Sequence, residues 1–384
     1  MEEDKIFDFN YIIVSCIFDT QKRSGLSYKR TGEKYCHLFN YVNNLNLPTI
    51  LFIESHLIDK IKPREGLIII KKELEELNTF KKIDPIKETL RPTQNEARLD
   101  AYYTSVINSK IELLYEASNY IKEKGLNFSH LLWLDSGISH VGTVPREQFL
   151  NDIKLHIYKD KITLVMMMAT TPNEIKNEEA YLSVNRGKIA AGLLIVPTDL
   201  IDWFNNLMIE QFNKCINIYK RMCMEEQLMS ILTVNYPEKF EYIFSDYWML
   251  PNLRYINNRI HIIIANLAYC REHSLLDTGY KILLRLINSL NYARSLCSHH
   301  ELCQILYDGQ IICFYKNREL SKKLGMFLAY LYYTNVHCKA WIDCKYDHIK
   351  NNLKFSDVDI DKKEDFTDDK ILPLDEEGLL WNSQ

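Results

Sequence analysis

An uninterrupted apolar run near the middle of the chain, ended by a polar turn, constrains the fold most. Residues 131–134 read Leu-Leu-Trp-Leu, and Asp135, Ser136 and Gly137 follow. A short continuous apolar run suits a strand buried on both faces of a mainly parallel sheet, and Ser-Gly supplies turn chemistry. In an open α/β sheet, ligands bind outside the carboxyl ends of the strands. Asp135 is therefore expected either to meet a ligand or metal ion, or to cap the following turn through its own backbone.

Apolar segments elsewhere in the chain predict the rest of the same sheet. Short runs rich in Ile, Leu and Val suit strands covered on both faces, and the amphipathic stretches between them suit helices. Strands that alternate with helices at this spacing indicate βαβ units and a parallel sheet. We therefore expect an α/β fold with a mainly parallel sheet flanked by helices. The expected strands are 11–18, 49–53, 66–70, 128–134, 163–168 and one ending at 197; the expected helices are 33–45, 99–122, 200–221 and 224–232.

The pattern changes towards the end of the chain. From 259 to 353 the apolar spacing is helical, and from 354 to 384 the sequence is acidic and poor in large apolar residues. Such composition indicates a solvated, partly disordered tail. We expect a sheet-containing domain over 1–258, a helical C-terminal portion over 259–353 and an acidic tail over 354–384.

Composition narrows the class of protein. The chain has 384 residues, of which 47% are hydrophobic, and a net charge of −4, which argues against a protein built to bind nucleic acid. No apolar run reaches the ~20 residues that cross a bilayer, and the acidic start lacks the features of a signal peptide. Ten cysteines form no CxxC pair and are interpreted as reduced thiols. We expect a soluble, cytoplasmic protein without a transmembrane segment.

The region after the first strand carries no standard nucleotide fingerprint. No GxGxxG and no GxxxxGK[ST] occurs, which excludes the dinucleotide-binding Rossmann and P-loop classes. The strand ends at Asp19, and a polar loop over 20–32 contains Lys22 and Arg23. This loop is either a mobile basic segment that faces a phosphate or nucleotide, or a solvated connection.

Three further features are candidates for a ligand site. Lys110 lies within the helix expected over 99–122, where a lysine is more often solvated than in contact with a ligand. The small residues Ala191 and Gly192 would let a ligand approach the backbone closely. Glu225 and Glu226 stand at the start of the helix 224–232, where acidic residues also complement the helix dipole. Being sequential, they point about 100° apart, and Glu225 points towards the buried stripe of that helix.

Six short segments occur in a characteristic order along the chain. They are Tyr-Thr-Ser-Val-Ile-Asn-Ser-Lys at 103–110, Leu-Trp-Leu-Asp-Ser-Gly-Ile at 132–138, Ala-Ala-Gly-Leu-Leu at 190–194, Met-Glu-Glu-Gln at 224–227, Pro-Glu-Lys-Phe at 237–240 and Ser-Asp-Tyr-Trp at 245–248. In these segments the chain resembles the HtrL/YibB family, whose members are similar to glycosyltransferases of the GT-A type. The similarity covers roughly residues 10–270.

The resemblance implies a site for a nucleotide-sugar donor such as a UDP-sugar. GT-A enzymes generally hold Mn²⁺ or Mg²⁺ with an Asp-x-Asp motif, but here Gly137 replaces the second Asp. The resemblance therefore implies a metal held by Asp135, with help from His140 or water, or a diphosphate neutralised by basic residues. The donor-binding residues expected are Asp19, Lys22, Arg23, Lys110, Asp135, Ser136, Gly137, Ala191 and Gly192.

The implied activity is that of a hexosyltransferase-like enzyme acting on an acceptor hydroxyl of a glycan, lipid or protein. An inverting reaction needs a carboxylate to take the acceptor proton. The family motif favours Glu226, with Glu225 second and Asp246 third. Two alternatives stay open: a sugar-nucleotide nucleotidyltransferase, and a non-catalytic protein that binds nucleotide sugars.

Overall fold

The computed structural model divides by its internal contacts into two units, Met1–Tyr255 and Ile256–Gln384. It describes residues 11–21, 31–94, 99–245, 247, 250, 251, 253, 260–272, 276, 279, 280, 282–284, 299–334, 336–344 and 346–353. The boundary expected at 258 and the expected tail over 354–384 lie outside these residues. Among the described residues, none of the helices combines the length and the hydropathy needed to span a membrane.

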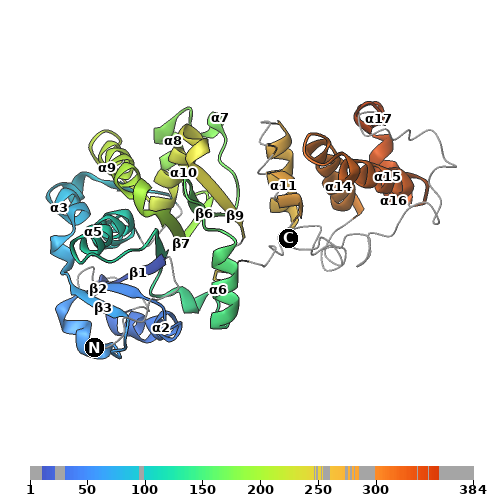
Figure 1. Ribbon diagram of the computed structural model, residues 1–384. Coiled ribbons are helices and arrows are strands. Elements are labelled where there is room, and N and C mark those ends of the chain that lie inside the picture. The colour runs from blue at the N-terminus through green and yellow to red at the C-terminus, as the bar shows by residue number, and fades with distance from the viewer. Residues whose placement is uncertain are drawn as a thin grey trace. The chain divides into compact units, whose positions relative to one another are not determined.

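The first unit is built on one seven-stranded sheet, which confirms the expected α/β class with a mainly parallel sheet (Figure 1). The strand order is β3-β2-β1-β5-β7-β6-β9. Only β7 runs antiparallel to its neighbours, β5 and β6. The strands are β1 Tyr11–Ile17, β2 Thr49–Ile53, β3 Leu67–Lys71, β5 His130–Leu134, β6 Ile162–Met166, β7 Ile189–Pro197 and β9 Phe240–Phe244; a two-stranded ladder pairs β4 Arg91–Pro92 with β8 Arg221–Met222.

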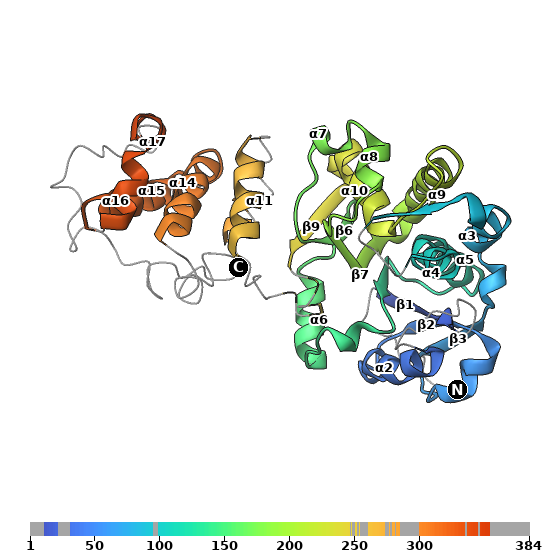
Figure 2. The same ribbon diagram turned by 180° about the vertical axis from the view of Figure 1, so that it is seen from behind.

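Helices cover both faces of this sheet (Figures 1 and 2). Because successive side chains of a strand point to opposite faces, Ile12 and Val14 of β1 join one core while Ile13 and Ile17 join the other. The first core includes side chains of α4 Ala101–Asn108, α5 Lys110–Glu123, α8 Glu178–Leu182, α9 Ile201–Asn217 and α10 Glu225–Asn235. The second includes side chains of α2 Gly32–Asn44 and α6 Arg146–Lys154.

Short helices connect these elements. They are η1 Ser55–Lys60, η2 Leu74–Glu76, α3 Asn78–Ile83, η3 Asp84–Thr89, η4 Ile138–His140, α7 Pro172–Ile175, η5 Thr198–Leu200 and η6 Pro237–Lys239.

The single helix expected over 99–122 is wrong in one respect that matters for the site. The helix is interrupted at Ser109, whose backbone N–H bonds to Val106 O at 3.2 Å instead of to the carbonyl four residues back. The Ser109 hydroxyl donates to the same oxygen at 2.8 Å, and such local side-chain bonds compete with the helical ladder. A new helix, α5, therefore begins at Lys110.

The second unit is helical in its described parts. Its helices are α11 Ile260–Glu272, α14 His299–Phe314, α15 Arg318–Thr334, α16 Val336–Asp343 and α17 Tyr346–Leu353. Asp308 of α14 is fully buried and accepts hydrogen bonds from Arg271 of α11 and from Gln304. The Arg271 guanidinium neutralises the buried carboxylate and ties α11 to α14, and Gln304, which lies on α14 itself, satisfies its other oxygen.

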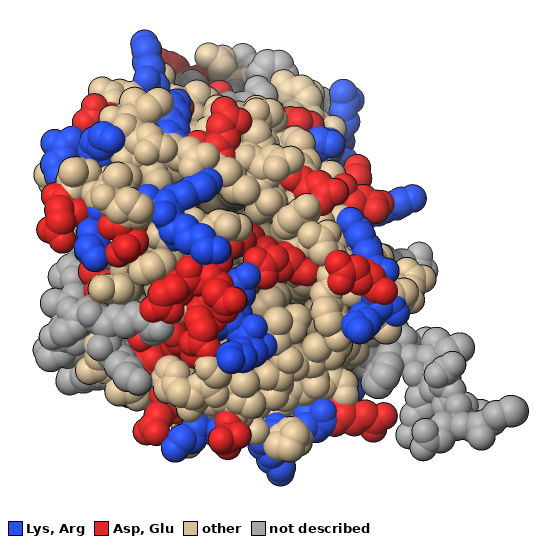
Figure 3. All heavy atoms as spheres, turned by 90° about the vertical axis from the view of Figure 1, so that its left-hand side faces the viewer, with Lys and Arg blue, Asp and Glu red and all other residues tan. Residues whose placement is uncertain are grey.

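The molecular surface mixes charges of both signs. Figure 3 shows basic side chains dispersed over the described part of one face, with Asp and Glu side chains gathered near its centre. This face does not present the continuous basic stripe that nucleic-acid-binding proteins carry.

Candidate active site

A cavity of about 650 Å³ opens at the carboxyl ends of β1 and β5. The strand order places β2 on one side of β1, and β5, β7 and β6 on the other, so the chain after β1 runs to one side of the sheet and the chain after β5 runs to the other. Such a topological switch point is where open α/β sheets bind ligands, and the volume lies within the roughly 300–1,000 Å³ of small-molecule sites. The wall includes Phe18, Thr20, Tyr35, Asp100, Tyr103, Lys110, Trp133, Asp135, Ser136, Gly137, His140, Gly192, Met224, Glu225, Glu226 and Tyr247.

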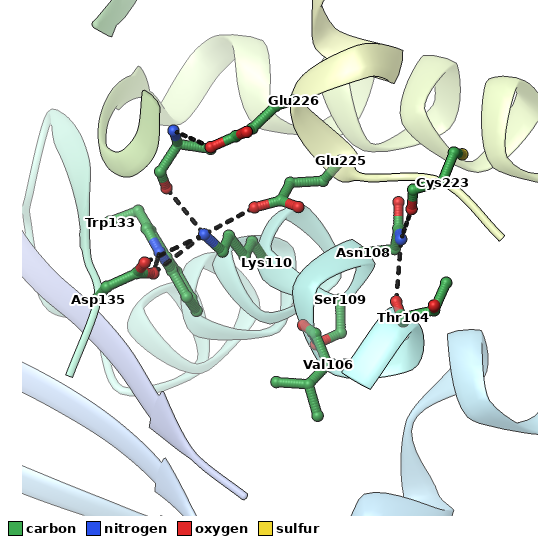
Figure 4. A network of polar contacts seen from close by, with 11 residues as sticks. Thr104, Val106, Asn108, Ser109, Lys110, Trp133, Asp135, Cys223, Glu225 and Glu226 are labelled. Atoms are coloured by element: carbon green, nitrogen blue, oxygen red, sulfur yellow. Dashed lines mark hydrogen bonds and ion pairs between the residues drawn. The ribbon is translucent and has the colours of Figure 1, made fainter. Parts of the chain in front are cut away.

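Lys110 connects the elements around this cavity (Figure 4). Its side chain is only 8% exposed, and its ammonium lies 3.0 Å from Asp135 Oδ1 and 2.8 Å from Glu225 Oε1. It also donates to the backbone oxygen of Ala191 at 2.9 Å. An ammonium has three N–H donors, and each of these partners lies on a different element: after β5, on α10 and on β7. Lys110 is therefore buried in a polar network and is not the solvated residue that a lysine in a helix most often is; its contact with a nucleotide-sugar donor stays a prediction.

Hydrogen bonds fix both the backbone and the side chain of Asp135. Its backbone N–H bonds to Gly192 O of β7 at 2.9 Å, which continues the pairing of β5 with β7. The indole N–H of Trp133 donates to Asp135 Oδ1 at 2.7 Å, because residues two apart on a strand share a face. The following turn is closed by the backbone oxygen of Asp135, which accepts from Ile138 N. The side chain is thus directed to Lys110 and Trp133 and does not cap the turn.

The two glutamates of α10 have different surroundings. Glu225 is 2% exposed and pairs with Lys110 through Oε1, while its Oε2 has no hydrogen-bond partner among the described residues. Glu226 is half-buried, and its Oε1 accepts the backbone N–H of Ala191 at 3.1 Å. The direction expected for Glu225 from the helical pattern is confirmed, and both side chains reach the cavity wall.

Burial and mutual repulsion set the protonation of this group. Burial raises the pKa of Glu226 to about 8, and the charge of Glu225 adds to the rise, against the opposing effects of Lys110 and the Ala191 amide. Burial alone would lower the pKa of Lys110, but the charges of Asp135 and Glu225 outweigh it and hold that pKa well above its ordinary value. Lys110 is therefore always charged, and Glu226 exchanges its proton near neutral pH.

The turn after Asp135 packs against helix α2. A Cβ atom on Gly137 would lie 2.7 Å from Cε1 of the Tyr35 ring, a distance that requires one of the two to move. Nδ1 of His140 must be the donor in its bond to the carbonyl oxygen of Gly137, because a carbonyl only accepts. Glycine at 137 thus lets an aromatic ring close one side of the cavity beside Asp135.

The side chains around Asp135 decide whether a divalent cation fits there. Within the described parts of the chain, no group of three or more His, Cys, Asp or Glu side chains could hold a metal ion. Both carboxylate oxygens of Asp135 already lie within hydrogen-bond reach of the Lys110 ammonium, and a cation there would be repelled by that charge. The described donor set does not fit a metal ion, so no chemical step is assigned to one. Metal binding by Asp135 stays a prediction.

The structure brings most of the expected site residues together. Lys110, Asp135, Ser136, Gly137, Gly192, Glu225 and Glu226 line one cavity, and Ala191 lies behind it, bonded to Lys110 and Glu226. Asp19 stands between the wall residues Phe18 and Thr20 and is not itself on the wall. Lys22, Arg23 and Asp246 lie outside the described residues.

Sequence reasoning missed three residues that support this site. Trp133 was assigned only to the core, although an indole two residues before a strand-ending Asp can reach it. Asn108 donates to Cys223 O at 3.0 Å and so ties the end of α4 to the residue pair before α10. Glu54 is buried directly after β2 and accepts the backbone N–H of Asp19 at 2.6 Å. The rule that identified Asp135, a polar residue that ends a buried strand, also applies to Glu54.

Comparison with protein-family models gives no match to the chain, and comparison with curated proteins gives no significantly similar sequence.

Proposed function

We propose that this protein is a glycosyltransferase with a GT-A-like fold, which moves a sugar from a nucleotide-diphosphate-sugar to an acceptor hydroxyl. One observation carries the proposal: a cavity of about 650 Å³ at the switch point of the sheet, with two carboxylates paired to one buried ammonium and a third, Glu226, on the same wall. Sites that join a concave cavity to groups of shifted pKa are the default candidates for chemistry in an α/β protein.

Glu226 is the residue we assign to proton transfer. In the reaction, the acceptor oxygen forms a bond to the anomeric carbon, and the bond from that carbon to the diphosphate breaks with its electron pair. The acceptor proton passes to Glu226, whose Oε2 makes no bond to a described residue while its Oε1 accepts from Ala191 N at 3.1 Å. A base with a pKa near the working pH suits this role, and that of Glu226 is about 8.

Lys110 and its two carboxylate partners, Asp135 and Glu225, are assigned to positioning. Because the ammonium already serves Asp135, Glu225 and Ala191 O, it has no N–H left for a diphosphate. The leaving diphosphate needs cationic partners, and Lys22 and Arg23 stay the residues predicted to supply them. Asp135, whose side chain is 35% exposed, is the carboxylate of this set most open to a sugar hydroxyl.

The experiment that tests the proposal measures binding before turnover. Calorimetric titration and thermal shift with UDP, UDP-glucose, GDP and GDP-mannose, with and without Mn²⁺, should show binding that stabilises the fold by mass action. Asp135→Asn should weaken sugar-nucleotide binding, and Glu147→Gln, at a highly exposed carboxylate, is the matched control that should not. Binding that strictly requires Mn²⁺ would contradict the neutralisation of Asp135 by Lys110.

Product analysis then separates the alternatives. Release of a nucleoside diphosphate, by transfer or by slow hydrolysis, supports a glycosyltransferase. Release of pyrophosphate would point to a nucleotidyltransferase. Binding without any turnover over a broad panel of acceptors would point to a non-catalytic binding protein, and the absence of any nucleotide binding would overturn the proposal.

A further inference from the structure

The polar cluster of the cavity, formed by Asp135, Glu225 and Glu226, has more hydrogen-bond acceptors than donors. Each ionised carboxylate offers two acceptor oxygens and no donor. The donors that reach the cluster from described residues are the Lys110 ammonium, the Trp133 indole and the Ala191 amide. The ammonium also spends one N–H on a backbone oxygen. A ligand group in contact with this cluster has to bring donors of its own.

Two carboxylate oxygens of the cluster receive no hydrogen bond from a described residue. Glu225 Oε2 is buried without a hydrogen-bond partner among the described residues. Glu226 uses Oε1 for the Ala191 amide, and its other oxygen makes no bond to any described residue. Figure 4 shows the Glu225 side chain directed from α10 towards Lys110, and the Glu226 side chain directed to the backbone amide that it accepts. A buried acceptor left unpaired is costly, so a donor-bearing ligand gains from completing these bonds.

The charges on the described wall also disfavour a negatively charged ligand group. Lys110 is the only lysine or arginine among the described wall residues, which also include His140, against the four acidic residues Asp100, Asp135, Glu225 and Glu226. The Lys110 charge is already shared between two of these carboxylates. An additional negative charge would be desolvated beside like charges, which is unfavourable in a cavity of low dielectric.

We infer that the ligand group bound at this cluster is rich in hydrogen-bond donors and carries no negative charge: the sugar is a neutral or amino hexose and not a hexuronic acid. The inference rests on the proposed function and specifies the class of sugar on its nucleotide-sugar substrate. Hydroxyl or ammonium groups of the sugar would donate to Glu226 and Asp135, while the diphosphate lies towards the part of the wall formed after β1. A carboxylate on the sugar would face the cluster beside Lys110, the lysine of the described wall, whose charge is already paired with Asp135 and Glu225.

The test compares nucleotide sugars whose sugar differs in one chemical group. UDP and GDP are titrated first, because they report the nucleotide part of the site alone. UDP-glucose is then compared with UDP-glucuronic acid, or GDP-mannose with GDP-mannuronic acid if GDP is the nucleotide that binds. We expect the hexuronic acid donor to bind roughly tenfold or more weakly than the hexose donor. The titrations are made at pH 9, where Glu226 is ionised. Glu226→Gln then removes one negative charge and should narrow this ratio, whereas the exposed control Glu147→Gln should leave it unchanged.

The outcomes separate this inference from the function on which it rests. If a nucleotide binds but the acidic and neutral donors bind equally, the inference falls and the nucleotide-sugar site stands. A ratio that Glu226→Gln leaves intact, in a variant that melts normally, would also overturn it. If neither nucleotide nor any of the four donors binds, the proposed function fails and the inference fails with it.

Discussion

Lys110 stands where a lysine is least favoured in an isolated helix. It is the first residue of α5, and the N-terminus of a helix carries partial positive charge that repels cations. The cost is offset by two carboxylates at 3.0 and 2.8 Å, one of them on a helix whose own N-terminus favours acidic residues. The position of Lys110 is thus explained by the tertiary structure and not by local preference.

Replacing this lysine should be strongly destabilising. Lys110→Met leaves Glu225 buried without its counter-charge, and breaking a buried ion pair from one side costs about 3–5 kcal/mol. The measurement is the free energy of unfolding from urea titration. Lys60→Met, which removes an exposed lysine paired with Glu33, is the control and should change it by less than about 0.5 kcal/mol. Equal losses in the two variants would show that the Lys110 network adds nothing to stability.

The raised pKa of Glu226 predicts how stability depends on pH. The unfolded side chain has an ordinary glutamate pKa, and the folded one is about 8, so between these values the native state binds more protons. Stability contributed by this residue is therefore lost as pH rises towards 8 and beyond. Glu226→Gln cannot ionise, so its melting temperature relative to wild type should increase from pH 5 to pH 9. A difference that stays constant over this range would contradict the shift.

The same residue predicts the pH dependence of the proposed reaction. If Glu226 takes the acceptor proton, kcat/KM should rise with pH and level off above about 8. Glu226→Gln should lower turnover about 10²-fold or more. Its affinity for a neutral sugar donor should be retained, because the Gln amide oxygen still accepts a hydrogen bond from a sugar hydroxyl. Full activity of Glu226→Gln would remove it as the base; a loss in Glu225→Gln alone would move the assignment one residue.

At the level of elements, the sequence identifies residues at the edge of the sheet but not the residues that they contact on other elements. Asp135 could be found because an apolar run stops there, and Glu225 because the stripe of its helix is readable. The break at Ser109 could not, since the residues around it read as one continuous helix. Nor could the contact of Lys110 with Ala191, 81 residues away, because helical periodicity says which face is buried but not against what.

The contact of α2 with the turn after β5 predicts a coupled pair of substitutions. Gly137→Ala places a Cβ atom against the Tyr35 ring, and overpacking of this kind costs about 1–3 kcal/mol. In the Tyr35→Ala background the ring is gone, so the added methyl should cost much less. A double-mutant cycle by urea unfolding measures the coupling, expected at about 0.5–3 kcal/mol. If the two substitutions changed the free energy of unfolding additively, the added methyl group would not be pressing on the Tyr35 ring.

At the scale of the whole chain, the first unit contains its own two cores and the entire described cavity wall. A unit with a complete core can fold alone. We expect residues 1–255 to be soluble, to melt in one cooperative transition and to bind the same nucleotide sugar as the full chain with a Kd within a factor of a few. Aggregation of this fragment, or loss of binding by a fragment that melts normally, would show that the second unit is needed.

The three-way contact of Lys110 also governs when the site can appear during folding. Its partners lie 25 and 81 residues along the chain for Asp135 and Ala191, and further still for Glu225. Contacts of such sequence separation pay their loop-closure entropy before they contribute stability. Partly folded and nascent chains therefore have strands and helices before they have a ligand site, so competence to bind a nucleotide sugar should emerge only in the last kinetic phase of refolding.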